Sequence, residues 1–226
     1  MIRRNQGDWL QVGFTHKAVH RFAYGWHNKT FARTKGRENI PATGGFLYVG
    51  NHTSWWDPIF MSATTPRPVR YLAKSTLGNS KFGQWFIFDS GGCIPVDRNR
   101  ANPDAYKAAI DALRAGGVVG VFPEGTRHAG EMGRAKTGVA RMALEAGVPV
   151  VPAGFTTDRF WPPTKKVPAV REPVYVNIGA PRTFTGDPND ASLVRKVTDD
   201  IMVDVKRLLD EAKGARDRKD KWARVP

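Results

Sequence analysis

Residues 46–57 read FLYVGNHTSWWD, a short apolar run that ends in a polar turn. Runs of this length, rich in β-branched and aromatic residues, are typical of buried strands. Similar runs occupy residues 69–73, 93–97, 118–122, 148–154 and 174–179. Helical patterns lie between them, from Asn102-Pro103 to the stop at Gly116-Gly117 and over residues 134–146. The alternation predicts an α/β layered fold with a mostly parallel central sheet flanked by helices.

The two ends of the chain differ from this middle part. Residues 1–35 place Trp9, Phe22 and Trp26 on one helical face and are rich in Lys and Arg, which is typical of an amphipathic membrane-associating helix. A second apolar helical pattern ends at about residue 212, and a basic tail follows it. We therefore expect a membrane-associating segment over 1–35, one folded domain over 36–212 and a loose tail over 213–226.

Charge and composition limit the classes of function. Lys and Arg number 35 against 21 Asp and Glu, a net charge of +14, which favours partners that carry phosphate. Cys93 is the single cysteine, so no intramolecular disulfide or CxxC site can form, and a lone cysteine beside a strand is most often a core residue. No apolar stretch approaches the roughly 20 residues of a membrane span, so any membrane contact should be peripheral. We predict no metal site, because the His16 and His20 pair has no acidic residue near it in the sequence.

His52 and Asp57 can be interpreted in two ways. Asp57 can be the N-cap of a helix with Pro58 at its first position, which leaves His52 as an ordinary loop residue. Alternatively, the carboxylate can hold the imidazole Nδ1-H, which presents Nε2 as a general base. The two interpretations are compatible because a carboxylate has two oxygens.

A second polar stretch, FPEGTR at residues 122–127, directly follows the apolar run VVGV. It can be a Pro/Gly turn with two exposed charges. Side chains at the C-terminal end of a strand, however, lie where ligands bind in open α/β sheets, and a guanidinium there can bind a phosphate through two hydrogen bonds.

NHTSWWD and FPEGTR together resemble two signature blocks of the glycerolipid acyltransferase family. Residues 91–98, GGCIPVDR, and residues 148–154, VPVVPAG, resemble its second and fourth blocks. All four occur in the family's order, and the resemblance covers roughly residues 36–160.

The resemblance implies a site and a reaction. His52 corresponds to the catalytic base and Asp57 to its orienting partner. The acceptor phosphate would be bound by Arg98, Glu124, Gly125, Thr126 and Arg127. Aromatic residues near the first two blocks are candidates for an acyl-chain pocket, namely Trp55, Trp56, Phe60, Phe82 and Trp85. The family's reaction needs no cofactor.

The expected activity is transfer of a fatty acyl group from acyl-CoA or acyl carrier protein to a lysophospholipid hydroxyl, with 1-acylglycerol 3-phosphate as the first candidate acceptor and phosphatidic acid as its product. We expect a peripheral enzyme on the cytoplasmic face of an anionic membrane, with no nucleic acid partner. Glycerol 3-phosphate, other lysolipids and lipid-linked sugars remain alternative acceptors. A different class, a non-enzymatic basic protein that binds membranes or nucleic acid, would fit the charge.

Overall fold

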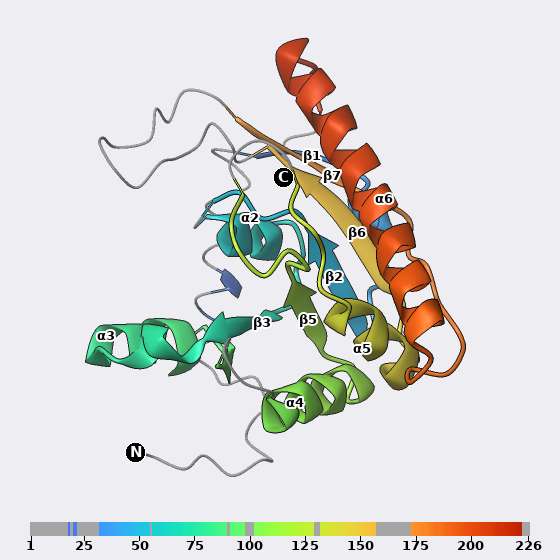
Figure 1. The fold of residues 1–226 in the computed structure, drawn as a ribbon. Coiled ribbons are helices and arrows are strands. Elements are labelled where there is room, and N and C mark those ends of the chain that lie inside the picture. The colour runs from blue at the N-terminus through green and yellow to red at the C-terminus, as the bar shows by residue number, and fades with distance from the viewer. Residues whose placement is uncertain are drawn as a thin grey trace.

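The computed structural model describes residues 18, 20–21, 32–54, 56–89, 91–97, 102–128, 132–156 and 173–222. Within these ranges the protein forms a seven-stranded sheet in the order β1-β7-β6-β2-β5-β3-β4, with helices on both faces (Figure 1). The predicted α/β fold with a mostly parallel sheet is confirmed. Most of the expected membrane-associating segment lies outside the described residues, as do Trp55 and Arg98.

The strands follow the apolar runs of the sequence. Their bounds are β1 Ala32–Lys35, β2 Phe46–Gly50, β3 Val69–Lys74, β4 Ile94–Val96, β5 Val118–Val121, β6 Val150–Phe155 and β7 Val174–Ile178. β6, β2, β5, β3 and β4 run parallel to one another, whereas β7 pairs antiparallel with β6 and β1 pairs parallel with β7. The parallel strands therefore end at one common edge of the sheet.

Two helical layers cover the sheet. Helices α4 (Pro103–Arg114), α5 (Gly138–Ala146) and α6 (Ala191–Asp217) pack on one face, and α2 (Asp57–Ala63) with the π-helix η4 (Gln84–Asp89) packs on the other. Alternate residues of β2 enter the two cores: Leu47 and Val49 face α4, α5 and α6, while Phe46 and Tyr48 face α2. Burial of both faces explains why β2 is apolar throughout. None of the described helices has the length and apolarity of a membrane-crossing segment.

The N-terminal prediction needs correction at two points. Residues 32–35 are not part of an amphipathic helix, because they form β1 at the edge of the sheet. His20, which falls within the predicted membrane-associating segment, is buried, and its Nε2 donates to the carbonyl oxygen of Thr65 at 2.9 Å. This contact fixes residue 20 to the folded domain.

Two helix boundaries and one helix cap also differ from expectation. The helix predicted from residue 134 begins at Gly138, although it ends at Gly147 as predicted. The helix after Asn102 begins at Pro103, but the Asn102 side chain contacts the backbone of Asp97 and not the helix end. Helix α6 continues past residue 212 to Asp217, so the expected tail begins inside a helix. Trp222 packs against Tyr175 with ring centroids 5.4 Å apart, so this part of the expected tail contacts the sheet.

Candidate functional site

The polar residues singled out in the sequence meet at the edge where the parallel strands end. His52 lies two residues beyond β2, and Glu124 lies three residues beyond β5, the strand paired with β2. Asp57 is the first residue of α2, which begins after the turn that follows β2. This is the edge at which open α/β sheets bind ligands.

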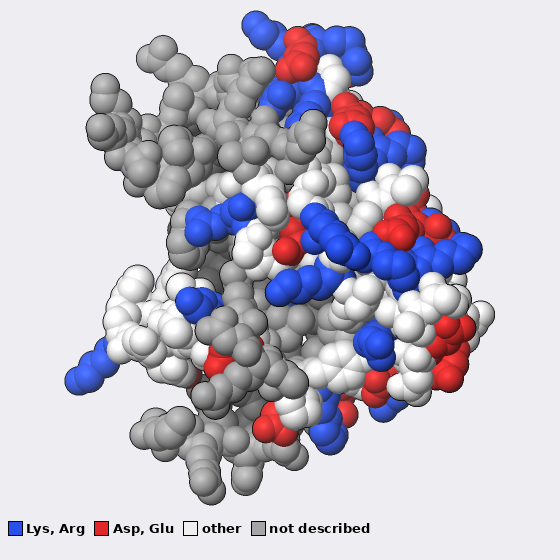
Figure 2. Space-filling view, in the orientation of Figure 1, with Lys and Arg blue, Asp and Glu red and all other residues white. Residues whose placement is uncertain are grey.

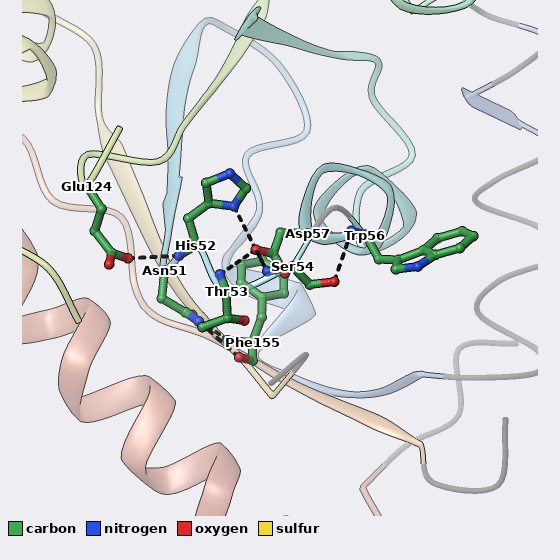
Figure 3. Close-up of polar contacts among 8 residues, drawn as sticks. All are labelled: Asn51, His52, Thr53, Ser54, Trp56, Asp57, Glu124 and Phe155. Carbon is green, nitrogen blue, oxygen red and sulfur yellow. Dashed lines mark hydrogen bonds and ion pairs between the residues drawn. The ribbon is translucent and has the colours of Figure 1, made fainter. Parts of the chain in front are cut away.

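The His52 imidazole and the Asp57 carboxylate contact each other, with Nδ1 and Oδ2 2.7 Å apart (Figure 3). The backbone N–H groups of Thr53 and Ser54 also donate to Oδ2, at 2.7 and 2.8 Å. An oxygen that accepts from two N–H groups cannot also donate, so Nδ1 carries the proton. Nε2 then has its lone pair available, and Figure 3 shows it turned away from Asp57.

Asp57 does not cap α2, which corrects one of the two interpretations of the sequence. Trp56 occupies the N-cap position, and Pro58 is therefore the second residue of the helix. The Asp57 carboxylate turns back into the preceding loop, where it is fully buried. Its hydrogen bonds hold the His52 ring and the loop backbone in one arrangement.

Glu124 supports the loop that carries His52 from the other side. Its Oε1 accepts from the backbone N–H of His52 at 2.8 Å, and its Oε2 accepts from the N–H of Gly133 at 2.7 Å. Only 4% of the residue is exposed. Both carboxylate oxygens therefore accept from the backbone, and the assignment of Glu124 to phosphate binding stays a prediction.

Aromatic stacking and a backbone contact complete the support of His52. Its ring stacks on Phe122 with centroids 4.5 Å apart and an interplanar angle of 17°, and Phe122 in turn stacks on Tyr71. The carbonyl oxygen of His52 accepts from the backbone N–H of His128 at 3.0 Å. The His52 side chain keeps 14% of its surface exposed, so the ring is held but accessible.

Asn51 is a site residue that the sequence reasoning missed. Its side chain makes two hydrogen bonds to the backbone of Phe155, accepting from N–H at 2.8 Å and donating to the carbonyl oxygen at 3.1 Å. The contact joins the end of β2 to the end of β6. Its only signal in the sequence is an amide residue directly after an apolar strand. The block at residues 148–154 contributes to β6, a fully buried strand paired on both sides.

The remaining residues of the FPEGTR block face outward. Gly125 has φ of +70°, which an L-residue rarely adopts, and the Lys136 side chain lies against it. Thr126 and Arg127 are exposed, and Thr126 Oγ1 lies 3.1 Å from His128 Nε2. Figure 2 shows basic groups gathered on this face between the positions of α2 and α6. Arg127 and Lys136 are exposed basic side chains near this edge.

The aromatic candidates for an acyl-chain pocket do not form one group. Phe60 is fully buried in the core between α2 and the sheet, and Trp56 is half-buried beside it. Phe82 and Trp85 are exposed on the α3–η4 protrusion, where α3 spans Lys81–Gly83. Phe60 therefore lies in a different environment from Phe82 and Trp85, and the acyl-chain pocket stays a prediction.

Cysteine and metal chemistry find no support among the described residues. Cys93 is buried, and burial raises the pKa of its thiol to about 12, so the thiol stays protonated and unreactive at neutral pH. No group of three or more His, Cys, Asp or Glu side chains in the described ranges is placed to hold a metal ion.

Comparison with known proteins points to one family. The family described as Acyltransferase matches residues 32–156. The 1-acyl-sn-glycerol-3-phosphate acyltransferase of Streptococcus pneumoniae is 30% identical over 178 residues, which is 74% of this chain and 62% of the relative. The enzyme of the same name from Bacillus subtilis is 33% identical over 120 residues, 53% of this chain and 59% of the relative. These matches thus span about three fifths of each relative.

The fold also has a counterpart among solved structures. The crystal structure of the 1-acyl-sn-glycerophosphate (LPA) acyltransferase PlsC from Thermotoga maritima aligns with a TM-score of 0.70 and 24% identity. The alignment covers 99% of this chain and 86% of that protein. The likeness extends the agreement in fold beyond residues 32–156.

Proposed function

The chain belongs to the Acyltransferase family, and on this premise we propose that it transfers a fatty acyl group from a thioester donor to a hydroxyl of 1-acylglycerol 3-phosphate. The observation that carries the proposal is the His52–Asp57 pair at the C-terminal edge of the sheet, inside the matched region. The names of the relatives support the choice of acceptor.

In the proposed mechanism, His52 acts as the general base. An acceptor hydroxyl has a pKa far above 7, so Nε2 removes its proton as the oxygen attacks the thioester carbonyl. Asp57 stabilises the imidazolium that forms and keeps the proton on Nδ1. Collapse of the tetrahedral intermediate releases the thiolate, which takes the proton from Nε2. The product is the diacyl ester, and no acyl-enzyme intermediate is needed.

Positioning residues keep His52 ready for this step. Glu124 holds the backbone of His52 through one carboxylate oxygen, and Phe122 supports the face of its ring. Asn51, which precedes His52, is fixed to β6 by its two hydrogen bonds to the backbone of Phe155. General acid–base catalysis depends on the alignment of the base with the attacking hydroxyl, so these contacts serve the reaction without touching the substrate.

The acceptor phosphate would be bound by Arg127, with Arg98 as the second ligand implied by the family resemblance. Arg127 is exposed at the same edge as His52 and follows the strand paired with β2. A guanidinium can bind two phosphate oxygens at once, which orients the acceptor as well as attracting it.

The proposal is tested by release of thiol. The purified protein is incubated with oleoyl-CoA and 1-acylglycerol 3-phosphate, free CoA is detected with a thiol reagent, and the lipid product is separated by chromatography. We expect acceptor-dependent CoA release together with phosphatidic acid. A parallel set with glycerol 3-phosphate, other lysolipids and acyl carrier protein as donor identifies the preferred pair. If every acceptor and donor leaves the thiol signal at its background, the proposed activity is wrong.

A further inference from the structure

Three aromatic side chains stand exposed on the protrusion formed by α3 and η4. Phe82, Trp85 and Phe86 are 68%, 52% and 42% exposed. Their rings contact one another, with centroids 5.6 Å apart for Phe82 and Phe86 and 6.3 Å apart for Phe82 and Trp85. Among the described residues, the only other large apolar side chain with comparable exposure is Val203 on α6. We call the three residues the aromatic cluster; a contiguous exposed apolar patch indicates a binding surface.

The rest of the protrusion holds this cluster outward. Phe88 is buried in the core below it, and a Cβ on Gly83 would lie 2.0 Å from the carbonyl oxygen of Leu77, so the helix packs tightly against the preceding turn. The hydroxyl of Ser80 accepts from the N–H of Gly83 at 2.9 Å and caps the helix. The aromatic rings therefore cannot enter the core without unfolding the protrusion.

The charge around the cluster is mostly positive. Lys74 and Lys81 are the charged residues of 74–88, and Asp89 at the end of η4 is bonded to Gln84. Both lysines are exposed. In Figure 2 the protrusion is a mostly uncharged body with a basic group at its outer end. The surface thus combines large aromatic rings with positive charge, which is the combination that binds the interface of an anionic bilayer.

The protrusion also lies at the edge of the sheet that carries His52. It leaves from the C-terminal end of β3, which is parallel to β5 and through it to β2. Insertion of the cluster into a membrane would therefore bring that edge close to the lipid surface.

We propose that Phe82, Trp85 and Phe86 insert into the headgroup region of an anionic bilayer, with Lys81 contacting lipid phosphate. The role of this membrane contact rests on the proposed function, because a lysophospholipid acceptor resides in a bilayer. A second copy of the chain is a poorer occupant, since two copies with a net charge of +14 each repel one another.

Binding to vesicles tests the inference without any substrate. The full chain is sedimented with vesicles of phosphatidylcholine alone or mixed with phosphatidylglycerol, and the partition coefficient is measured. Trp85→Ser should weaken binding to the anionic vesicles by about tenfold, and triple replacement of the cluster by Ser should weaken it by about a hundredfold or more. Val203→Ser, which removes an equally exposed apolar side chain from α6, should leave it unchanged. Lys81→Gln should weaken binding to the anionic vesicles alone.

A second measurement locates the contact directly. Lipids brominated in their acyl chains quench nearby tryptophan, so wild-type fluorescence should fall on binding. Trp85→Phe keeps an aromatic ring, so it should bind but be quenched less. Equal partition of the folded triple variant and the wild type would overturn the inference, as would equal quenching in Trp85→Phe. Wild-type dimerisation that the triple variant abolishes would show that the cluster binds a second copy instead. If vesicle binding gives the expected results while no acyl transfer occurs, the proposed function is wrong and the aromatic cluster is still a membrane-binding surface.

Discussion

Replacing Glu124 by Gln separates its role as a positioning residue from a role in phosphate binding. Both carboxylate oxygens accept backbone N–H groups, at 2.8 Å from His52 and 2.7 Å from Gly133. Gln has one acceptor oxygen, so its NH₂ group must face one of these donors. The variant therefore loses one hydrogen bond to a charged acceptor and leaves a buried N–H unpaired.

The expected magnitude follows from these contacts. Hydrogen bonds to charged groups contribute about 1.5–3 kcal/mol, so Glu124→Gln should lower the free energy of unfolding by about 2 kcal/mol. For a protein of this size that loss corresponds to a fall in Tm of about 4–8 °C. A displaced His52 loop should also lower kcat by about 10–100-fold, because alignment errors near 1 Å are costly, while the KM for the acceptor changes little.

The assay combines thermal unfolding with CoA release at varied acceptor concentration. Asp210→Asn is the matched control, since it makes the same chemical change in an exposed pair with Lys206 and should cost less than about 1 kcal/mol. If Glu124 faced the acceptor phosphate, removal of its charge would lower the acceptor KM and leave Tm and kcat unchanged. That result would refute the positioning role.

Other residues give further expectations. Arg127→Ala should raise the acceptor KM by about tenfold or more without changing the donor KM, because it loses a charge-assisted phosphate contact. The control Arg114→Ala, on the distant α4, should leave the acceptor KM unchanged. Equal use of an acceptor without phosphate by the wild type would exclude the phosphate site. Cys93→Ala should keep most of the turnover, and loss of turnover in a folded Cys93→Ala would point to a covalent role. Burial raises the pKa of the native thiol to about 12, so the thiol should resist thiol reagents at neutral pH until the protein unfolds. Burial lowers the pKa of His20 below its usual 6.5, so the unfolded chain binds the extra proton first and stability should fall as the pH drops below about 6.5. His20→Gln can still donate to Thr65 but does not titrate, so the fall in its Tm between about pH 7 and pH 5 should be smaller, and an identical fall would show that His20 does not contribute.

The sequence predicts the central part of the fold well because burial on both faces leaves a strong pattern. β2 and β5 are apolar at every position, and their ends carry the polar blocks of the site. β1 has no such pattern, since ARTK is short and basic and pairs on one side as an edge strand. The antiparallel direction of β7 has no signal in the sequence either, because pairing direction depends on the path of the connecting chain.

The sequence also predicts one part of the candidate site and not another. The spacing of His52 and Asp57 allows their contact, and the structure contains it at 2.7 Å. Sequence cannot tell whether a carboxylate faces a substrate or the backbone, so Glu124 was assigned to phosphate binding, although it holds the His52 loop. Apolar composition likewise does not distinguish a core from an exposed surface, and the sequence could not show that the side chains of Phe82 and Trp85 are exposed.

The most direct test of the account is the turnover of His52→Ala in the CoA-release assay, with oleoyl-CoA and 1-acylglycerol 3-phosphate at saturating concentrations. General base catalysis by Nε2 predicts a loss of about 10²–10⁴-fold in kcat, with the Tm and circular dichroism of the wild type retained. Asp57→Asn should be severely impaired as well, because the imidazolium loses its charged partner. Near-normal turnover by a folded His52→Ala would contradict the account.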